Sequence, residues 1–220
     1  MWIAKFPSLH DRTDIGGWEI VTYELAKAAG IHMAECKAKK FSSNHHTFLT
    51  NRFDRNHKGE RIHFASAMTM LGYMDGQGGA SYLDLVGFLT TKGANVDADL
   101  EELWRRIVFS ICVSNSDDHL RNHGFILTPR GWVLSPAYDI NPVETATGLS
   151  LNISENDNAL DLSLALDVCG YFRLSRRRAN EIISKVTTTV KNWPGIADSY
   201  GIPSSEQALK SKAFSRAMSQ

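Results

Sequence analysis

The sequence predicts an α+β protein, with a small N-terminal lobe over residues 1–55 and a mainly helical C-terminal lobe over residues 56–220. Two observations predict this class. Short strand-like runs occur near the start, at residues 2–6 and 47–50, whereas apolar residues at helical spacing dominate the later part. A chain of 220 residues buries about 70% of its unfolded surface, so such a core needs no disulfide bonds.

The first lobe is expected to contain one helix between its strands. Residues 18–29 carry apolar side chains at helical spacing, and Gly30 follows where a helix stop belongs. A polar turn is expected at residues 56–60. The glycine cluster at residues 76–79 lacks the lysine of a phosphate-binding loop. It therefore predicts a flexible connector, and it is a candidate for the joint between the two lobes.

The second lobe is expected to be built on a helix over residues 99–113, where one apolar stripe follows i, i+3, i+4 spacing. Asp97 or Asp99 is expected to cap it. Further helices are predicted at residues 160–168 and 175–191. A last, more loosely attached helix is predicted at residues 204–218.

Charge and cysteine content exclude several classes of function. Lys and Arg number 24 and Asp and Glu also number 24, so no basic field is available for binding nucleic acid directly. The three cysteines form no C-x-x-C pair, which predicts core thiols rather than disulfides or a zinc site. His45, His46 and His57 show no metal-binding spacing and are expected to be exposed. With no signal peptide and no membrane span evident, the sequence predicts a cytoplasmic protein without a membrane partner.

The segment that carries chemistry follows the helix at residues 99–113. It reads Ser-Asn-Ser-Asp-Asp-His-Leu-Arg-Asn-His-Gly-Phe over residues 114–125, and it is polar between apolar flanks. A tight turn centred near Arg130 predicts a hairpin that places residue 138 opposite Asn122. Asp139 would then return beside Asn122, and Asp117 lies just upstream on the same loop. Local geometry therefore predicts that Asp117, Asn122 and Asp139 gather at one end of a hairpin.

Amide and carboxylate oxygens suit a hard cation such as Mg²⁺. A further carboxylate that accepts the proton of an attacking hydroxyl is what phosphoryl transfer requires. The pattern D-x-x-x-x-N, followed by an aspartate after a hairpin, is the arrangement of the protein-kinase catalytic site. Two alternatives remain open: a loop whose side chains only satisfy turn backbone groups, and a hydrolase metal site at Asp117, Asp118 and His119.

This segment, together with Leu-Ser-Pro-Ala-Tyr-Asp-Ile-Asn-Pro at residues 134–142, closely resembles the C-terminal kinase domain of HipA-family serine/threonine kinases. These kinases are the toxins of bacterial toxin–antitoxin pairs. The strand with Lys5, the helix start at Trp18 and Glu19, and Asn-Arg-Phe-Asp-Arg at residues 51–55 agree in order, so the resemblance covers nearly the whole chain. It implies a protein-kinase-like two-lobed fold whose N-terminal lobe is incomplete here.

The resemblance implies a role for each matching position. Asp117 would be the catalytic base, and Asn122 and Asp139 the Mg²⁺ ligands. Lys5 would be the nucleotide-binding lysine, with Glu19 as its carboxylate partner and Glu24 as a competitor for that role. The residues implied to line the nucleotide are Asn51, Arg52 and Phe53 at the hinge, and His119, Arg121 and Tyr138 near the catalytic loop.

The resemblance also implies an activity and partners. ATP would donate its γ-phosphate to a protein hydroxyl, in autophosphorylation and in a translation-related target such as an aminoacyl-tRNA synthetase. The expected partner is a small DNA-binding antitoxin. Only four residues precede Lys5, where family members have further strands and a phosphate loop.

Three interpretations of this departure remain open. The chain is a shortened kinase, its missing lobe comes from a separate chain, or it is a non-catalytic module that binds an antitoxin or partner subunit. Retention of Asp117, Asn122 and Asp139 favours descent from an active kinase, although the missing loop would weaken ATP binding and slow transfer.

Overall fold

The computed structural model describes residues 1–218, and its elements confirm the predicted α+β class. The strands are β1 (Trp2–Lys5), β2 (Cys36–Lys39), β3 (Thr47–Asn51), β4 (Phe64–Ser66), β5 (Gly124–Thr128) and β6 (Gly131–Leu134). The α-helices are α1 (Ile15–Ala29), α2 (Ala67–Leu71), α3 (Tyr82–Lys92), α4 (Val96–Val113), α5 (Leu162–Asp167), α6 (Arg176–Val190), α7 (Trp193–Ser199), α8 (Ser204–Lys210) and α9 (Ser215–Met218). Short 3₁₀ turns lie at Cys169–Phe172 and Ser211–Phe214.

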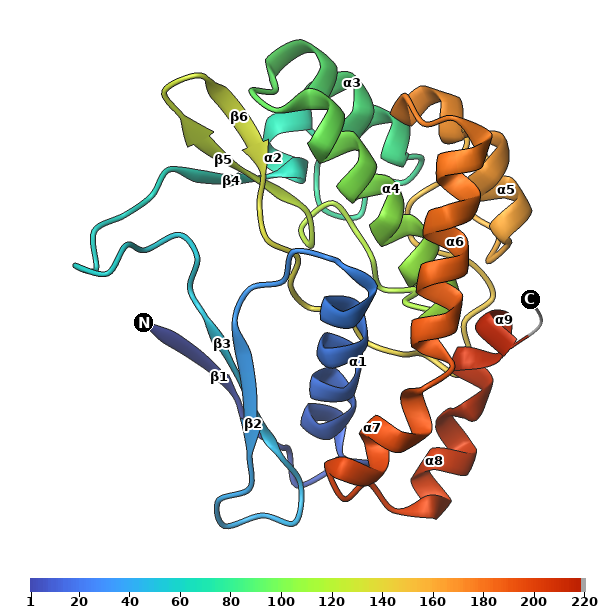
Figure 1. Ribbon diagram of the computed structural model, residues 1–220. Coiled ribbons are helices and arrows are strands. Elements are labelled where there is room, and N and C mark those ends of the chain that lie inside the picture. Colours follow the sequence, from blue (N-terminus) through green and yellow to red (C-terminus); the bar gives the residue numbers. More distant parts are fainter. Residues whose placement is uncertain (219–220) are drawn as a thin grey trace.

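The strands form two separate antiparallel sheets (Figure 1). The N-terminal sheet has the order β1-β3-β2 and lies beside α1. The second sheet has the order β4-β5-β6 and packs against α2 and α3. Residues 52–63 connect the two sheets along one side of the molecule.

Helix α1 joins the N-terminal sheet to the helical body. It begins three residues before the predicted start, because the Asp14 carboxylate accepts a hydrogen bond from the Gly17 amide and caps the first turn. Gly30 ends it with φ +91°, a left-handed conformation that glycine adopts without steric cost. One part of α1 contacts β2 and β3, and another contacts α6 and α7. A side chain on α1 can therefore face the N-terminal sheet while its backbone is fixed by the helices.

Helix α4 is the centre of the core, as its apolar stripe predicted, and residues such as Leu103, Trp104 and Ile107 are fully buried. The predicted cap is wrong. Asn95 precedes the helix without a side-chain capping bond, and Asp99 turns inward to accept a hydrogen bond from the Leu134 amide at 3.0 Å. That carboxylate satisfies the end of β6 instead of the start of its own helix.

Three further predictions are corrected by long-range packing. His46 is buried rather than exposed, with its Nδ1 2.5 Å from Asp14 Oδ2. Residues 204–218 form α8, a 3₁₀ turn and α9 rather than one loose helix, and Phe214 within them is fully buried. The glycine cluster connects α2 to α3 inside the helical part, so it is not the joint between the sheets.

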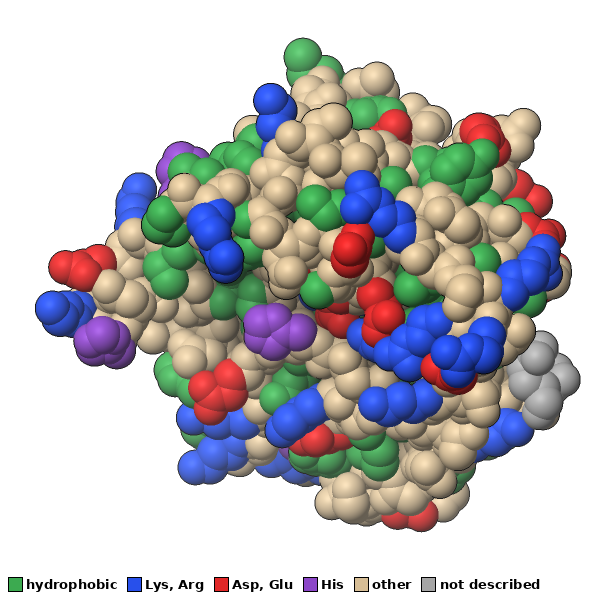
Figure 2. Space-filling view, turned by 45° about the horizontal axis from the view of Figure 1, so that its top comes forward, with side chains coloured by type: hydrophobic (Ala, Val, Ile, Leu, Met, Phe, Trp, Pro, Cys, Tyr) green, Lys and Arg blue, Asp and Glu red, His purple; other side chains and the backbone are tan. Residues whose placement is uncertain are grey.

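The surface carries mixed charge. On the face shown in Figure 2, basic and acidic side chains lie beside one another. Ion pairs between α6 and α4, such as Arg178 to Glu101 at 2.7 Å, are of this kind. Within residues 1–218, none of the helices is both long enough and apolar enough to cross a membrane.

Candidate active site

Lys5 is the point where three parts of the chain meet. Its Nζ lies 2.7 Å from Glu19 Oε1 on α1 and 2.5 Å from Asp139 Oδ1, which follows β6. Of the two carboxylates that competed as its partner on α1, Glu19 makes the contact, whereas Glu24 accepts a hydrogen bond from the Tyr200 hydroxyl. Residues 5, 19 and 139 are therefore brought together, as the kinase pattern requires.

The electrostatics of this trio depend on burial. Burial raises the pKa of Glu19 to about 7, although the facing Lys5 opposes the rise. Burial alone would lower the pKa of Lys5, but Glu19 and Asp139 outweigh it and hold that pKa above its ordinary value. Lys5 is therefore a fixed cation at neutral pH, within reach of a negatively charged ligand.

Asp139 is held in place by its backbone as well as by Lys5. Its φ of +58° is left-handed, a conformation that aspartate tolerates better than most residues. The preceding Ala137 donates its amide to the His32 carbonyl at 2.7 Å and accepts from the Ala34 amide at 2.9 Å. The segment after α1 thus pairs with the segment before Asp139 and fixes it opposite Lys5.

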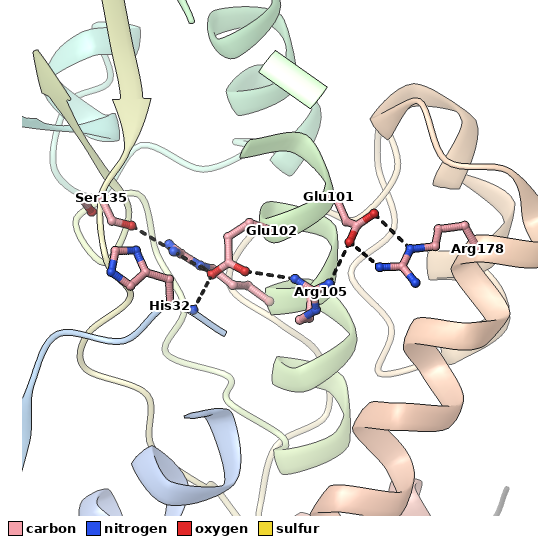
Figure 3. Close-up of polar contacts among 7 residues, drawn as sticks. His32, Glu101, Glu102, Arg105, Ser135 and Arg178 are labelled. Carbon is pink, nitrogen blue, oxygen red and sulfur yellow. Dashed lines mark hydrogen bonds and ion pairs between the residues drawn. The ribbon is translucent and has the colours of Figure 1, made fainter. Parts of the chain in front are cut away.

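Helix α4 supports both sides of this pairing (Figure 3). Glu102 accepts a hydrogen bond from the His32 amide at 3.0 Å. Arg106 donates to the Ser135 carbonyl at 2.8 Å and is paired with Glu102 at 3.0 Å. Through these bonds helix α4, the centre of the core, fixes the segment that carries Asp139.

The loop expected to be catalytic starts where α4 ends, at Ser114 with φ +54°. Asn122 is buried and donates its Nδ2 to the Asp117 carbonyl at 2.9 Å, which closes the loop on itself. This bond uses the amide nitrogen, so the amide oxygen is the atom suited to a cation. The Asp117 side chain is 78% exposed, and its Oδ1 lies 3.9 Å from His119 Nε2. Asp117 can therefore be reached from solvent.

The predicted hairpin brings the two halves of the site together. Strands β5 and β6 pair Phe125 with Leu134, one residue from the predicted register. The Tyr138 hydroxyl donates to the Arg121 carbonyl at 2.7 Å. Because Arg121 precedes Asn122 and Tyr138 precedes Asp139, this bond joins the segments that carry the two expected metal ligands.

A cavity of about 260 Å³ lies beside the hinge predicted at residues 51–53. Its wall includes the aromatic rings of Phe53, Phe64 and Tyr138; the centroid of the Phe53 ring lies 5.5 Å from that of Tyr138 and 5.3 Å from that of Phe64. Ile3 of β1 also lines the cavity. An aromatic and apolar wall of this kind suits a flat heterocyclic base.

The other two hinge residues line the same cavity, but their polar groups are bound to neighbouring carboxylates. Asn51 donates its Nδ2 to Glu35 at 3.1 Å. Arg52 forms a two-bond pair with Asp54, with Nη2 2.5 Å from Oδ2. The backbone amides of Asn51 and Arg52 are also donated, to the Glu35 and Met1 carbonyls, so these groups would have to leave their partners before binding a ligand.

A second cavity, of about 280 Å³, lies between the glycine cluster and the catalytic loop. The Arg121 guanidinium, expected beside the nucleotide, is paired here with Asp75 across this cavity's wall. His119 also lines it, and its Nδ1 is buried without a hydrogen-bond partner. His119 and Arg121 therefore face the loop at residues 75–80 in this structure.

Asp118 plays a part that its position next to Asp117 did not reveal. Its side chain is only 6% exposed, accepts a hydrogen bond from the Tyr82 hydroxyl, and lies 2.8 Å from His123 Nε2. The aspartate therefore anchors the catalytic loop to α3. The signal available in the sequence was only the adjacent pair of aspartates, which does not tell which of the two is buried.

The residues present fit a hard cation. Asn122 and Asp139 offer an amide and a carboxylate oxygen from joined segments, and Mg²⁺ usually takes one or two protein ligands beside phosphate and water oxygens. Among residues 1–218, no cluster of three or more His, Cys, Asp or Glu side chains suits a metal ion. A cation here would therefore rely on a ligand such as a nucleotide for the rest of its coordination.

The sequence and the fold of this chain are similar to those of known kinases. The chain is 27% identical over 147 residues to the serine/threonine-protein kinase toxin HipA of Shewanella oneidensis, covering 57% of this chain and 34% of that protein. The structure of Shewanella oneidensis HipA, in a complex with HipB and its operator DNA, matches with a TM-score of 0.76 and 22% identity, over 98% of this chain and 57% of that one.

The Helicobacter pylori proinflammatory kinase CtkA matches with a TM-score of 0.60 and 13% identity, over 99% of this chain and 90% of that one. At these identities the two structures show a shared kinase-like fold. The chain spans just over half of the HipA chain in that complex and about a third of the curated HipA sequence. Residues 1–193 match the HipA-like C-terminal domain, and the chain therefore belongs to that family.

Proposed function

We propose that this protein binds ATP with Mg²⁺ and transfers the γ-phosphate to a serine or threonine hydroxyl of a protein, its own chain included. The observation that supports this most strongly is the contact of Lys5 with both Glu19 and Asp139, close to the hinge cavity. A lysine paired with a helix carboxylate and a metal-binding aspartate are two parts that kinase catalysis needs in place together.

The nucleotide would be bound by three groups of residues. The base enters the cavity lined by Phe53 and Tyr138. Lys5 faces the phosphates as a fixed cation, while Asn122 and Asp139 hold Mg²⁺. Bound Mg²⁺ would neutralise the charge on the transferring phosphoryl group.

Asp117 is proposed as the residue that receives the proton. The substrate hydroxyl oxygen forms a bond to the γ-phosphorus, the bond from that phosphorus to the bridging oxygen of ADP breaks, and the hydroxyl proton passes to the Asp117 carboxylate. The exposure of this side chain suits a protein substrate that must approach from solution.

The same proposal extends to partners. The Shewanella oneidensis neighbour is assembled with HipB and operator DNA, and we propose a small DNA-binding antitoxin as the partner of this chain. A translation-related protein such as an aminoacyl-tRNA synthetase is the proposed target, in the cytoplasm. A separate chain that completes the N-terminal lobe is a further proposed partner, and β1, one of the two edge strands of its sheet, is where it would add.

The experiment is calorimetric titration of the full chain with ATP and MgCl₂, comparing the wild type with Lys5→Met and with Lys37→Met as the matched control. Lys37 lies on β2 of the same sheet and contacts the Trp2 ring instead of the carboxylates. Lys5→Met should weaken binding at least about tenfold, as expected for one lost charge-assisted contact. Equal affinity of the two variants, or no binding by the wild type, would refute the proposal.

A further inference from the structure

The C-terminal residues contact three segments that support proposed site residues: the start of α1, the segment after Asp139 and the end of α4. Here the C-terminal clamp means residues 204–218, comprising α8, the turn Ser211–Phe214 and α9. The clamp lies beyond residue 193, where the match to the HipA-like family ends. The structural match to HipA covers 98% of this chain, so the shared fold extends past the end of the family match.

The first contact is with the start of α1. Glu206 Oε2 accepts a hydrogen bond from the Asp14 amide at 2.9 Å and another from Trp18 Nε1 at 3.3 Å. Asp14 caps α1, and Trp18 is the neighbour of Glu19. One carboxylate on α8 thus fixes both the cap of α1 and the turn that presents Glu19 to Lys5.

The second contact is with the segment that follows Asp139. Lys210 Nζ lies 2.5 Å from Glu144 Oε2 and donates to the Pro142 carbonyl at 3.3 Å. Lys210 is at the other end of the same short helix as Glu206. Helix α8 therefore connects the contacts that support Glu19 with the contacts that support Asp139.

The third contact is with the entrance to the catalytic loop. The Ser114 hydroxyl donates to the Ala213 carbonyl at 2.7 Å, and it accepts a hydrogen bond from Arg216 Nη1 at 3.1 Å. Ser114 is the left-handed residue that ends α4, three positions before Asp117. These bonds hold it in a conformation that is unfavourable for a residue with a side chain.

Aromatic packing fixes the clamp on the body. The Phe214 ring is stacked on Trp193, with ring centroids 4.7 Å apart and an interplanar angle of 10°, and lies 6.1 Å from Trp18. All three rings are buried. The polar contacts are thus made by a segment that is itself rigidly placed.

We propose that the C-terminal clamp positions the site, with Glu206 as the positioning residue that holds Glu19 against Lys5 and Lys210 as the one that holds Asp139. The effect on catalysis rests on the proposed function, whereas the positions of Lys5, Glu19 and Asp139 relative to one another do not depend on it. It can be measured without nucleotide, so its failure is distinct from failure of the kinase proposal.

The experiment compares Glu206→Ala, Glu206→Gln and the control Glu181→Ala in the full chain. Glu181 lies on α6 and pairs with arginines of its own helix. The first readout is amide hydrogen exchange of α1, and the second is the rate at which acetyl N-hydroxysuccinimide labels the Lys5 amine at fixed pH, relative to Lys37. Glu19→Ala calibrates the second readout, because it removes one carboxylate from Lys5 directly.

Glu206→Ala should raise exchange in the first turn of α1 about tenfold, the factor expected for one lost charge-assisted hydrogen bond. It should also speed Lys5 labelling towards the Glu19→Ala rate. Glu206→Gln keeps an acceptor oxygen and should restore both readouts most of the way, and Glu181→Ala should match the wild type. Faster exchange with unchanged Lys5 labelling would overturn the proposal, because Glu206 would then only stabilise the fold.

A second variant keeps the test decisive if Glu206→Ala does not fold. Lys210→Met leaves Glu206 in place and removes only the bond to the segment after Asp139. It should speed Lys5 labelling without changing exchange in α1. If Lys5 in this variant is labelled at the wild-type rate, the proposed role of Lys210 in holding Asp139 is refuted.

Discussion

Asp117 and Asp118 are neighbours in the chain with opposite surroundings. The Asp117 side chain is 78% exposed and lies 3.9 Å from His119, whereas that of Asp118 is 6% exposed and is held by Tyr82 and His123. The Asp117 carboxylate can be presented to a substrate only if the loop is held in place, and the contacts of Asp118 hold it. The comparison indicates that the exposed aspartate is available for chemistry and the buried one supports the loop.

The ionisation of Asp118 agrees with this division. Burial by itself would raise its pKa, but the facing His123 and the hydrogen bonds from Tyr82 and His123 bring the pKa below its ordinary value. Asp118 therefore stays ionised in the folded protein, with its oxygens occupied. A carboxylate in that state is a poor acceptor for a substrate proton.

The largest effect that separates the two aspartates is expected on phosphoryl transfer. Asp117→Ala should reduce autophosphorylation, measured with labelled ATP, by about 10²–10⁴-fold, the usual contribution of a positioned general base. Its melting temperature should stay at the wild-type value, because an exposed side chain contributes little to folding. A variant that transfers phosphate at the wild-type rate, or one that melts well below the wild type, would reverse the assigned roles.

The corresponding change at the buried neighbour should act on stability. Asp118→Ala leaves His123 without its partner and should lower the free energy of unfolding by about 3 kcal/mol or more, measured by urea denaturation. Because the folded pKa of Asp118 is depressed, its contribution is present above the unfolded pKa and is lost as pH falls through the folded value. The penalty of the variant should therefore shrink in acid.

Tyr82→Phe is the matched control for Asp118→Ala, because it removes one hydrogen bond and leaves the ion pair. It should cost about 1–2 kcal/mol, less than the aspartate variant. Equal costs for the two variants would mean that His123 contributes nothing to the anchoring of Asp118.

Much of this site could be predicted because it is local in sequence. The hairpin after Gly124 follows from a turn at residues 128–131, and it carries Asp139 back towards Asn122 to within one residue of the observed register. Gly124 itself fits closely, since a Cβ there would lie 2.2 Å from the Phe64 ring. Helix α4 could also be predicted, because a helix with one buried face carries apolar residues at regular spacing in the sequence.

The features that were missed depend on partners far apart in the chain. Asp14 and His46 are 32 positions apart, and Tyr82 and Asp118 are 36 apart. No spacing rule relates such residues, so His46 was expected at the surface and Asp118 was left as a candidate metal ligand. The pairing of Lys5 with Glu19 was expected only through the family resemblance, for the same reason.

Glu19 extends the comparison, because it is a second buried carboxyl whose pKa moves in the opposite direction. Burial raises its pKa to about 7, and Lys5 only partly offsets this, whereas His123 and Tyr82 together more than offset the burial of Asp118. Lys5 is divided between two carboxylates and is itself partly exposed. A shared, half-solvated partner stabilises a buried anion less than a buried partner that contacts one carboxylate alone.

A third effect is expected at Glu19 and takes the form of pH dependence. Between an ordinary glutamate pKa of 4.5 and the raised value of about 7, the folded protein binds more protons than the unfolded chain. Stability should consequently fall as pH rises through this window, by up to about 3 kcal/mol. In Glu19→Gln this slope should disappear, as measured by urea denaturation across the window. Glu24→Gln, on the same helix and bonded to Tyr200, is the control. A Glu19→Gln curve parallel to the wild type would show that Lys5 stabilises Glu19 as fully as His123 stabilises Asp118.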